Sequence, residues 1–443
     1  MTSDTTPLAA VVMAAGLGTR MKSRLAKHLH PLLGMRVVDW VIDAARKTGV
    51  ERLVVVASPD TADAYTGVEV AVQERPLGTG DSVASAAPLL RGFDGRVLVL
   101  DAAAPLLTVD HFSALVGEHE RQQAAVTILS FEVDGLPYGR IVRDGDGSVQ
   151  AIVEHRDASA EELAIRELNS SIYVFDAEPL WDALSHLDPH NAQGELYLTD
   201  TVRTIVAAGG RAAAWICPDE HAPLGINTRA ELAVAAAVLR DRINEAHMLA
   251  GVTIVDPGTT WIEAGVALAE DVVVHPFTVL SGRTRVASGA EIGPHASVAD
   301  AVVGADASVG PFCYLRPGTV VEAGAKAGTF VEIKNSRIGA RTKVPHLSYI
   351  GDAEVGEDTN IAAGNITANF SHRPGQEKGR TRIGRNVRTG VDNTFLAPVE
   401  VGDDAWVYPG TVITKDVPPA ALAGFPPRQV NKENYVHRER DDG

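Results

Sequence analysis

The hydrophobic pattern of the chain changes character near residue 250. From residue 8 to about 225, short apolar runs rich in β-branched residues alternate with longer stretches of helical periodicity. The predicted strands are 10–14, 52–57, 97–100, 125–131 and 171–175, and the segment 37–48 is typical of the helices between them. This alternation predicts a largely parallel, Rossmann-like α/β sheet with helices on both faces. Ligands of such a sheet bind beyond the C-terminal ends of the strands.

After residue 251 the apolar positions follow a shorter period. Val309, Leu315, Val321, Ala327 and Ile333 recur every six residues. Three such hexapeptides form one triangular coil, in which the apolar residue points inward and the following small residue turns the corner. An antiparallel β protein, the alternative, would show period two. The pattern therefore predicts a left-handed parallel β-helix from about residue 255 to 430.

A helical segment separates these two regions. Residues 229–250 are rich in Ala, Glu, Arg and Leu and hold no Gly or Pro, which predicts one long linker helix. The expected domains are thus 1–228, the linker 229–250, and 251–443. Within the β-helix, 374–379 has the composition of an inserted loop, and 432–443 that of a solvated tail.

Composition narrows the class of protein. A formal charge of −17 argues against binding to nucleic acid, because phosphate backbones select basic surfaces. No run approaches the ~20 apolar residues of a membrane span, and the apolar stretch 8–16 lacks the basic start of a secretory signal. The two cysteines, Cys217 and Cys313, form no disulfide framework. We therefore expect a cytoplasmic protein without a membrane partner.

The first predicted strand runs into a phosphate-binding motif. Gly16-Leu17-Gly18-Thr19-Arg20 follows it directly, and Lys27 comes soon after. A strand that ends in Gly-x-Gly before a helix presents backbone N–H groups to phosphates. The third glycine of a dinucleotide fingerprint and the Gly-Lys-Ser/Thr of a P-loop are absent. By itself the Gly-x-Gly could equally be a structural turn, and the two cations favour the phosphate site.

The extended motif resembles that of the sugar-1-phosphate nucleotidyltransferases, with Ala26 in place of their usual proline. Further matching segments are Gln73 with 77–80, 138–142, 153–155, Asn169, 191–200, 225–229, 315–318, 330–334, 346–354 and 360–364. Together they resemble the GlmU family, whose members acetylate glucosamine-1-phosphate and then transfer uridyl from UTP to N-acetylglucosamine-1-phosphate. The resemblance covers residues 8–435.

That resemblance implies roles for individual residues of the N-terminal domain. Arg20 and Lys27 would act in catalysis on the triphosphate, and Asn227 would bind Mg²⁺. The substrate-binding residues implied are Ala14, Ala15 and Gly16 in the loop, Gln73, Gly78 and Thr79 at the uracil, and Gly139, Glu154 and Asn169 at the sugar.

In the β-helix the resemblance implies an acetyltransferase site between coils of a homotrimer, with His346 as the catalytic base. Imidazole can take the proton of an attacking amine near neutral pH, and arginine and lysine can neutralise a sugar phosphate. The implied amino-sugar ligands are Arg316, Lys334, Tyr349, Asn360 and Lys378, and the implied acetyl-CoA contacts are Ala363, Asn369, Phe370, Val391, Pro409 and Arg428.

Several positions depart from the family pattern. Ala103 replaces the aspartate that shares Mg²⁺ with the residue matched by Asn227, which removes a ligand and a charge. Asp101, two residues earlier, would face the same side of a strand about 7 Å away and could act through a water. Restoring aspartate by Ala103→Asp is then expected to raise uridyl transfer. Ser171 replaces a glycine and is expected to crowd the sugar.

The acetyl-CoA side departs as well: Phe370, Val391 and Pro409 replace tyrosine, serine and alanine, and Pro426 replaces an arginine for which Arg428 could substitute. Proline cannot donate the backbone hydrogen bond of alanine. The leading prediction remains the bifunctional enzyme. One alternative is a diverged paralog that binds sugar phosphates or nucleotides as a regulator or scaffold, which Ala103 favours and His346 disfavours. Another is a pyrophosphorylase for a different hexose phosphate.

Overall fold

The computed structural model describes residues 6–16, 18–370, 375, 377–425, 429–433 and 435. It divides into two compact units, 1–239 and 240–443, and the division falls within helix α7 (Arg229–Leu249). This helix covers the segment for which the composition predicted one. Among the described residues, no helix is long and apolar enough to cross a membrane.

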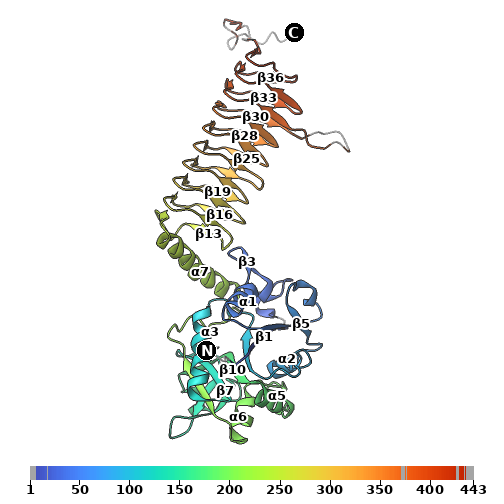
Figure 1. The fold of residues 1–443 in the computed structure, drawn as a ribbon, viewed down its shortest axis with the longest axis vertical. Helices are drawn as coiled ribbons and strands as arrows, with labels where there is room; N and C mark the ends of the chain where they lie inside the picture. The colour runs from blue at the N-terminus through green and yellow to red at the C-terminus, as the bar shows by residue number, and fades with distance from the viewer. Residues whose placement is uncertain are drawn as a thin grey trace, which may run out of the picture. The chain divides into compact units, whose positions relative to one another are not determined.

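A mixed sheet forms the middle of the first unit, in the order β11-β7-β10-β6-β1-β4-β5 (Figure 1). Its strands are β1 (Leu8–Ala14), β4 (Arg52–Ala57), β5 (Glu69–Val72), β6 (Arg96–Asp101), β7 (Val126–Glu132), β10 (Glu167–Asp176) and β11 (Ala212–Ile216), with β8 (Arg140–Arg143) and β9 (Val149–Val153) beside β10. Strand β1 pairs in parallel with β4 and β6, whereas β10 is antiparallel to β6 and β7. The predicted largely parallel sheet is confirmed.

Helices bury their apolar stripes on both faces of this sheet. One core holds side chains of α1 (Val37–Lys47), α3 (Val109–Gln122) and the start of α7, and the other holds those of α2 (Thr79–Ala84), α5 (Ala177–Ser185) and α6 (Asp200–Ala207). The remaining short elements are β2 (Pro31–Leu32), β3 (Met35–Arg36), α4 (Ala160–Leu163), and the 3₁₀ turns η1 (Thr19–Met21), η2 (Lys27–Leu29) and η3 (Ala62–Ala64). The central strands are buried on both faces, as the continuous apolar runs require.

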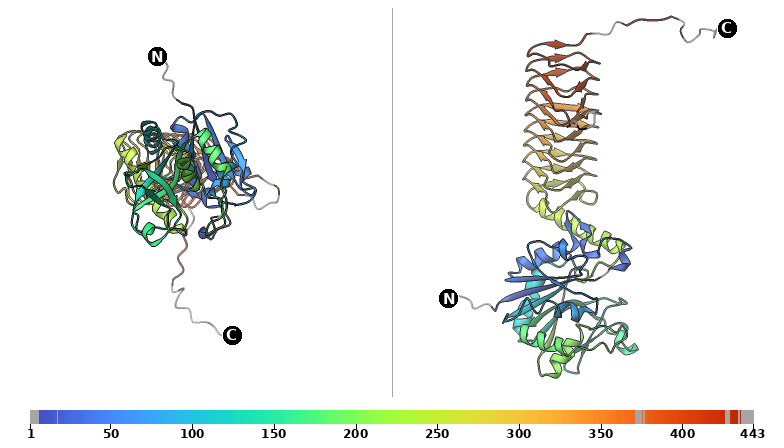
Figure 2. Two further views of the ribbon diagram at one scale, coloured as in Figure 1. Left: turned by 90° about the horizontal axis from the view of Figure 1, so that it is seen from below. Right: turned by 90° about the vertical axis from the view of Figure 1, so that its right-hand side faces the viewer.

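The second unit is a left-handed parallel β-helix with three sheets, whose stacked coils are clear in Figure 2. One sheet contains β12 (Thr253–Ile254), β15 (Val273–Val274), β18 (Glu291–Ile292), β21 (Ser308–Val309), β24 (Lys326–Thr329) and β27 (Lys343–His346), and is extended by β32 (Arg388–Thr389), β35 (Trp406–Val407) and β37 (Leu422–Ala423). We name it the first sheet.

The second sheet carries the strands that matter most below: β13 (Trp261–Ile262), β16 (Val279–Ser281), β19 (Ser297–Ala299), β22 (Tyr314–Leu315), β25 (Glu332–Lys334), β28 (Tyr349–Gly351), β30 (Ile366–Ala368), β33 (Thr394–Leu396) and β36 (Val412–Ile413). The third sheet contains β14 (Ala267–Leu268), β17 (Arg285–Val286), β20 (Val302–Val303), β23 (Val320–Val321), β26 (Arg337–Ile338), β29 (Ala353–Val355), β31 (Thr381–Ile383) and β34 (Val399–Val401).

The register of the sheets explains the period-six pattern. Ile338 pairs with Val355 and Ile383 with Val401, the two spacings of 17 and 18 residues expected for one coil. The inward residues of successive coils form one continuous apolar core, and most of them have no solvent-exposed surface. The coil between Val355 and Ile383 is longer. It contains the predicted inserted loop 374–379, of which Pro374 and Gln376 lie outside the described residues.

One corner of the β-helix, between the first and second sheets, carries an exposed apolar ladder. The rings of Phe277, His295, Phe312 and Phe330 stack on one another, with centroids 4.7, 4.7 and 5.2 Å apart. Leu347 takes the same corner position one coil further on, and the side chains of Phe330 and Leu347 are 57% and 60% exposed. All five residues have a positive φ. The corner backbone therefore turns these side chains outward in a row, which we call the aromatic ladder.

Candidate functional sites

The first site lies at the C-terminal ends of β1, β5 and β6, where a cavity of about 470 Å³ opens. Nine of the residues singled out from the sequence line it: Ala14, Ala15, Gly16, Lys27, Gln73, Gly78, Thr79, Asp101 and Ser171. Thr19 and Glu195, which belong to the motif and to the matching segment 191–200, line it as well. Sequence reasoning gave no role to the other lining residues, which are Met13, His28, Pro76, Ser82 and Ala102. Since the motifs of this cavity are those expected to bind UTP, we call it the nucleotide cavity.

Two glycines shape the nucleotide cavity. Gly18 has φ +58°, and a Cβ at this position would lie 2.8 Å from the Cβ of Lys27. The absence of a side chain therefore lets η2 approach the loop and places Lys27 at the cavity. Gly78 has φ +124°, and a Cβ there would lie 2.5 Å from the carbonyl oxygen of Leu196. Both positions require glycine for space and for backbone conformation.

Hydrogen bonds fix the polar side chains of the nucleotide cavity. The buried amide of Gln73 donates from Nε2 to the carbonyl oxygen of Gly78 (3.1 Å) and to Oδ2 of Asp81 (2.7 Å). Thr79 accepts from the backbone N–H of Leu198 through Oγ1 at 3.0 Å. Burial, with the charge of Lys27, lowers the pKa of His28 to about 4. His28 is therefore neutral near pH 7, and Lys27 is the cation of this wall.

A second cavity of about 570 Å³ adjoins the first. Arg20, Tyr138, Gly225 and Asn227 line it, together with Asp101. Lys27 lines the first cavity and connects it to the second, because its Nζ donates to Oδ1 of Asn227 at 3.2 Å. The structure thus brings Arg20, Lys27 and Asn227 to one region, as their predicted roles require.

The three residues expected at the sugar are placed differently. Glu154 lines a separate cavity of about 370 Å³ with Tyr197 and Thr199, and burial raises its pKa. Asn169 is 2% exposed and donates from Nδ2 to the hydroxyl of Tyr173 at 2.8 Å. Among the described residues that line the nucleotide cavity, neither of these two occurs, and nor does Gly139. Their predicted contacts with the sugar stay predictions.

Ser171 has the backbone conformation that favours glycine. Its φ is +64°, and its N–H donates to Oδ1 of Asn169 at 3.1 Å. A non-glycine residue in this region costs roughly 1–2 kcal/mol. Ser171 also lines both the nucleotide cavity and the cavity beside it. Its side chain therefore occupies space at their junction that the family glycine would leave open.

Ala103, where the family pattern has an aspartate, lies outside the strand on which the sequence prediction placed it. Strand β6 ends at Asp101, so the alternation of side chains along a strand does not extend to Ala103. Ala103 is fully buried and lines none of the cavities described here, whereas Asp101 lines two of them. The strand geometry on which that expectation depends does not extend to Ala103, because the chain turns after Asp101.

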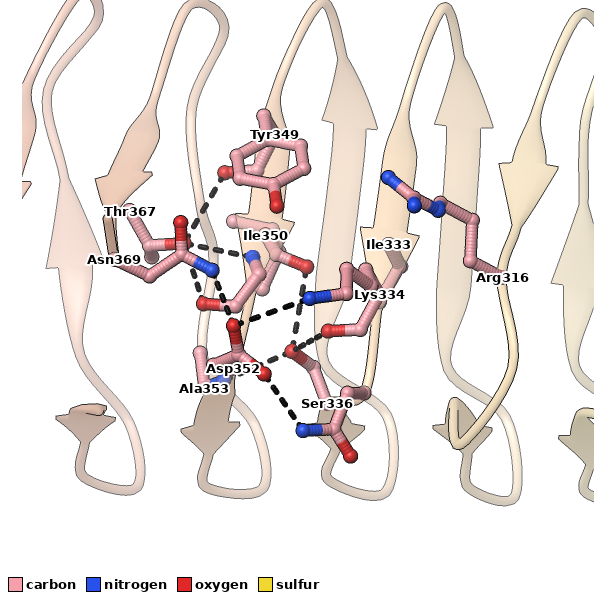
Figure 3. A network of polar contacts seen from close by, with 12 residues as sticks. Arg316, Ile333, Lys334, Ser336, Tyr349, Ile350, Asp352, Ala353, Thr367 and Asn369 are labelled. Atoms are coloured by element: carbon pink, nitrogen blue, oxygen red, sulfur yellow. Dashed lines mark hydrogen bonds and ion pairs between the residues drawn. The ribbon is translucent and has the colours of Figure 1, made fainter. Parts of the chain in front are cut away.

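The second site lies on the outer face of the second sheet of the β-helix, where β22, β25 and β28 lie side by side. Arg316 follows β22, Lys334 ends β25, and Tyr349 begins β28 (Figure 3). Nη1 of Arg316 forms an ion pair with Oε1 of Glu332 at 2.9 Å. The predicted amino-sugar residues of three successive coils thus meet on one face, although 33 positions separate Arg316 and Tyr349 in the sequence.

A buried carboxylate anchors this second site. Asp352, 8% exposed, accepts hydrogen bonds from Asn335 (2.6 Å) and Asn369, and pairs with Nζ of Lys334 at 3.5 Å (Figure 3). Burial alone would raise its pKa, but these hydrogen bonds hold the pKa below its usual value. In the sequence Asp352 is only one position of a matching segment. Its anchoring role was not predicted, because it depends on partners in the coils before and after its own.

Two lysines gather positive charge beside Asp352. The pKa of Lys378 is lowered, because the ammonium group of Lys334 lies beside it. Like charges held this close favour an anion between or above them. An exposed site with Arg316 and two lysines therefore has the charge to bind a phosphate group.

The remaining residues expected in the acetyltransferase lie around this face. His346 ends β27, opposite Thr329 of the preceding coil and next to Leu347 of the aromatic ladder, and it is exposed. Asn360 bridges Lys343 and Arg388 in the first sheet. Phe370, Val391 and Pro409 are exposed, and Ala363 is half-buried. The amide of Asn369 is turned to Asp352, and Arg428 lies outside the described residues, as does Pro426.

Comparison with known proteins decides the family. Residues 10–190 match the MobA-like NTP transferase domain. The chain is 47% identical to the bifunctional protein GlmU of Streptomyces coelicolor, over 98% of this chain and 95% of that protein. It is also 43% identical to the GlmU of Corynebacterium efficiens (99% and 96%) and 42% identical to that of Geobacillus thermodenitrificans (97% and 98%). The chain belongs to the GlmU family. GlmU proteins of these organisms match both units, so the resemblance seen in the motifs extends over the whole chain.

Proposed function

We propose that this chain makes UDP-N-acetylglucosamine in two steps, with each unit holding one of the two active sites. In the first step acetyl-CoA acetylates glucosamine-1-phosphate at the β-helix. In the second, N-acetylglucosamine-1-phosphate attacks UTP at the sheet domain and releases pyrophosphate. The observation that supports this most is that GlmU relatives match both units of the chain over nearly their full length.

In the acetyl transfer, the cations of the second site hold the sugar phosphate. Arg316 can bind it through a two-pronged guanidinium, and Lys334 and Lys378 add point charges. His346 takes the proton of the sugar amine as the nitrogen attacks the thioester carbonyl, and the thiolate of CoA leaves. Tyr349 and Asn360 are proposed to orient the sugar. Ala363, Asn369, Phe370, Val391, Pro409 and Arg428 are proposed to contact acetyl-CoA.

In the uridyl transfer, the loop Ala14–Gly16 cradles the triphosphate, and Gln73, Gly78 and Thr79 hold the uracil. Lys27 and Arg20 stabilise the negative charge as the sugar phosphate oxygen attacks the α-phosphorus. Gly139, Glu154 and Asn169 are proposed at the sugar. A bound Mg²⁺ would neutralise charge on the phosphates, and its protein ligands are proposed to include Asn227.

Separate assays of the two half-reactions test this function. Purified chain should release CoA thiol from acetyl-CoA when glucosamine-1-phosphate is added. It should also release pyrophosphate from UTP and N-acetylglucosamine-1-phosphate, and a chelator should stop that release. Absence of both products would contradict the proposed function. Loss of one alone would favour the diverged paralog.

We further propose a homotrimer, supported by the exposed aromatic ladder beside His346. A row of exposed apolar side chains is typical of a surface that another chain covers. Light scattering on the full chain should give three times the 46.8 kDa of one chain. Replacing Phe330 with serine should shift the mass toward that of one chain and lower acetyl transfer. A mass of 46.8 kDa for the unaltered chain would contradict the proposal.

Ser171 provides a test of how the sugar enters. Ser171→Gly should lower the KM for N-acetylglucosamine-1-phosphate, because it clears the junction of the two cavities. It should also remove a backbone strain of roughly 1 kcal/mol. Ser171→Ala is the matched control, since it keeps the Cβ and removes only the hydroxyl. If both variants keep the original KM, the side chain does not crowd the sugar.

A further inference from the structure

Two residues form the boundary between the nucleotide cavity and the cavity that adjoins it. Asp101 and Ser171 are the only described residues that line both. Asp101 stands at the end of β6, and its Oδ1 accepts from the N–H of Ala103 at 2.9 Å. This short turn fixes the carboxylate and leaves Oδ2 for another partner.

The free oxygen of Asp101 faces the segment that contains Asn227. A Cβ placed on Gly225 would lie 3.3 Å from Oδ2 of Asp101, so this oxygen is beside the Gly225 backbone. The same segment is tied to the end of β6, because the N–H of Ile226 donates to the carbonyl oxygen of Ala103 at 2.8 Å. Asp101 and Asn227 therefore line the same cavity from two connected segments.

These two side chains offer the oxygen ligands that Mg²⁺ prefers. Magnesium in such sites takes one or two carboxylates and completes its octahedron with phosphate oxygens and water. Lys27 already donates to Oδ1 of Asn227, but an amide oxygen has two lone pairs. Within the described part of the chain, no group of three or more His, Cys, Asp or Glu could hold a metal ion. The cation would thus need the nucleotide phosphates to bind tightly.

We propose that Asp101 supplies the carboxylate of the divalent-cation site together with Asn227, in place of the residue at position 103. The site rests on the proposed uridyl transfer and lies at the boundary of the two cavities. Position 103 does not take this role in this chain, because the methyl group of Ala103 offers the cation no ligand atom. The expectation that Ala103→Asp raises uridyl transfer stays a prediction.

Binding of Mn²⁺ to the full chain in the presence of UTP tests this site without turnover. Water-proton relaxation reports Mn²⁺ held on the protein. Asp101→Asn should weaken Mn²⁺ binding by roughly tenfold or more, the loss that even an outer-shell partner of a metal can cost. Gly225→Ala should weaken it to a smaller degree, since the added Cβ crowds Oδ2 of Asp101. Asp94→Asn, an exposed residue outside both cavities, is the matched control.

The outcomes separate this inference from the proposed function. If the unaltered chain releases pyrophosphate and Asp101→Asn binds Mn²⁺ as tightly as the unaltered chain, the inference fails and the function stands. If Mn²⁺ binding depends on Asp101 but no pyrophosphate is released, the inference stands and the function fails. Thermal unfolding of each variant verifies that it is folded.

Discussion

Replacing His346 with alanine is expected to lower acetyl transfer by about 10²- to 10⁴-fold, the usual contribution of a general base. The imidazole stands exposed at the end of β27, at the corner between the first and second sheets, while Arg316 and Lys334 stand on the face that begins there. Uridyl transfer should be unchanged, because its proposed site is built from the other unit. Thiol release from acetyl-CoA and pyrophosphate release, assayed separately, measure the two effects.

The control for this prediction is a half-buried histidine of the β-helix. His275 pairs with Glu291 at 2.6 Å near the start of the helix, well before the coils of the second site. His275→Ala should leave acetyl transfer intact. Added imidazole should restore part of the activity of His346→Ala, which a purely structural role would not explain. Equal acetyl transfer in both variants would remove His346 from the mechanism.

The second large effect is expected at Asp352. Asp352→Asn keeps the shape of the side chain but turns an acceptor into a partial donor, which faces the amides of Asn335 and Asn369. Asn369 is buried, and leaving its amide without an acceptor costs about 1–3 kcal/mol in the free energy of unfolding, whereas the exposed amide of Asn335 can turn to water. Lys334 also loses its partner, so the KM for glucosamine-1-phosphate should rise. Denaturant unfolding and steady-state kinetics measure these two changes.

The pH dependence of this effect has a defined sign. The pKa of Asp352 is lower in the folded chain than its usual value near ~3.9. Its contribution to stability is therefore fully present above about pH 4 and is lost as the pH falls through the folded pKa. The stability difference between the unaltered chain and Asp352→Asn should narrow at pH 3. Asp358→Asn is the control, because an exposed pair such as Asp358 with Arg341 contributes about 0–1 kcal/mol. Equal denaturant midpoints at pH 7 would contradict the anchoring role.

Much of the architecture follows from local patterns. A period of six predicts a β-helix, since one inward apolar residue must recur on each of the three faces of a triangular coil. Three hexapeptides to a coil therefore predict strands that pair about 18 residues apart, and Ile338 pairs with Val355 in this way. The loop before Lys27 was similarly informative, because Gly18 is required where the Lys27 side chain approaches the backbone. Such features depend on residues close in sequence or repeated at fixed intervals.

By itself, then, the sequence determined the two fold classes, the long helix α7, the GlmU resemblance and the types of residue in both sites. Tertiary structure alone decided which of them share a cavity. Glu154 lines a separate cavity, and Asp101 rather than Ala103 lines the nucleotide cavity. Asp352 contacts Lys334 and the side chains of the coils before and after its own. The physical reason is that side-chain alternation holds only within a strand, whereas β6 ends at Asp101 and the chain turns. After the end of the strand, hydrogen bonds between segments distant in sequence determine where each side chain points.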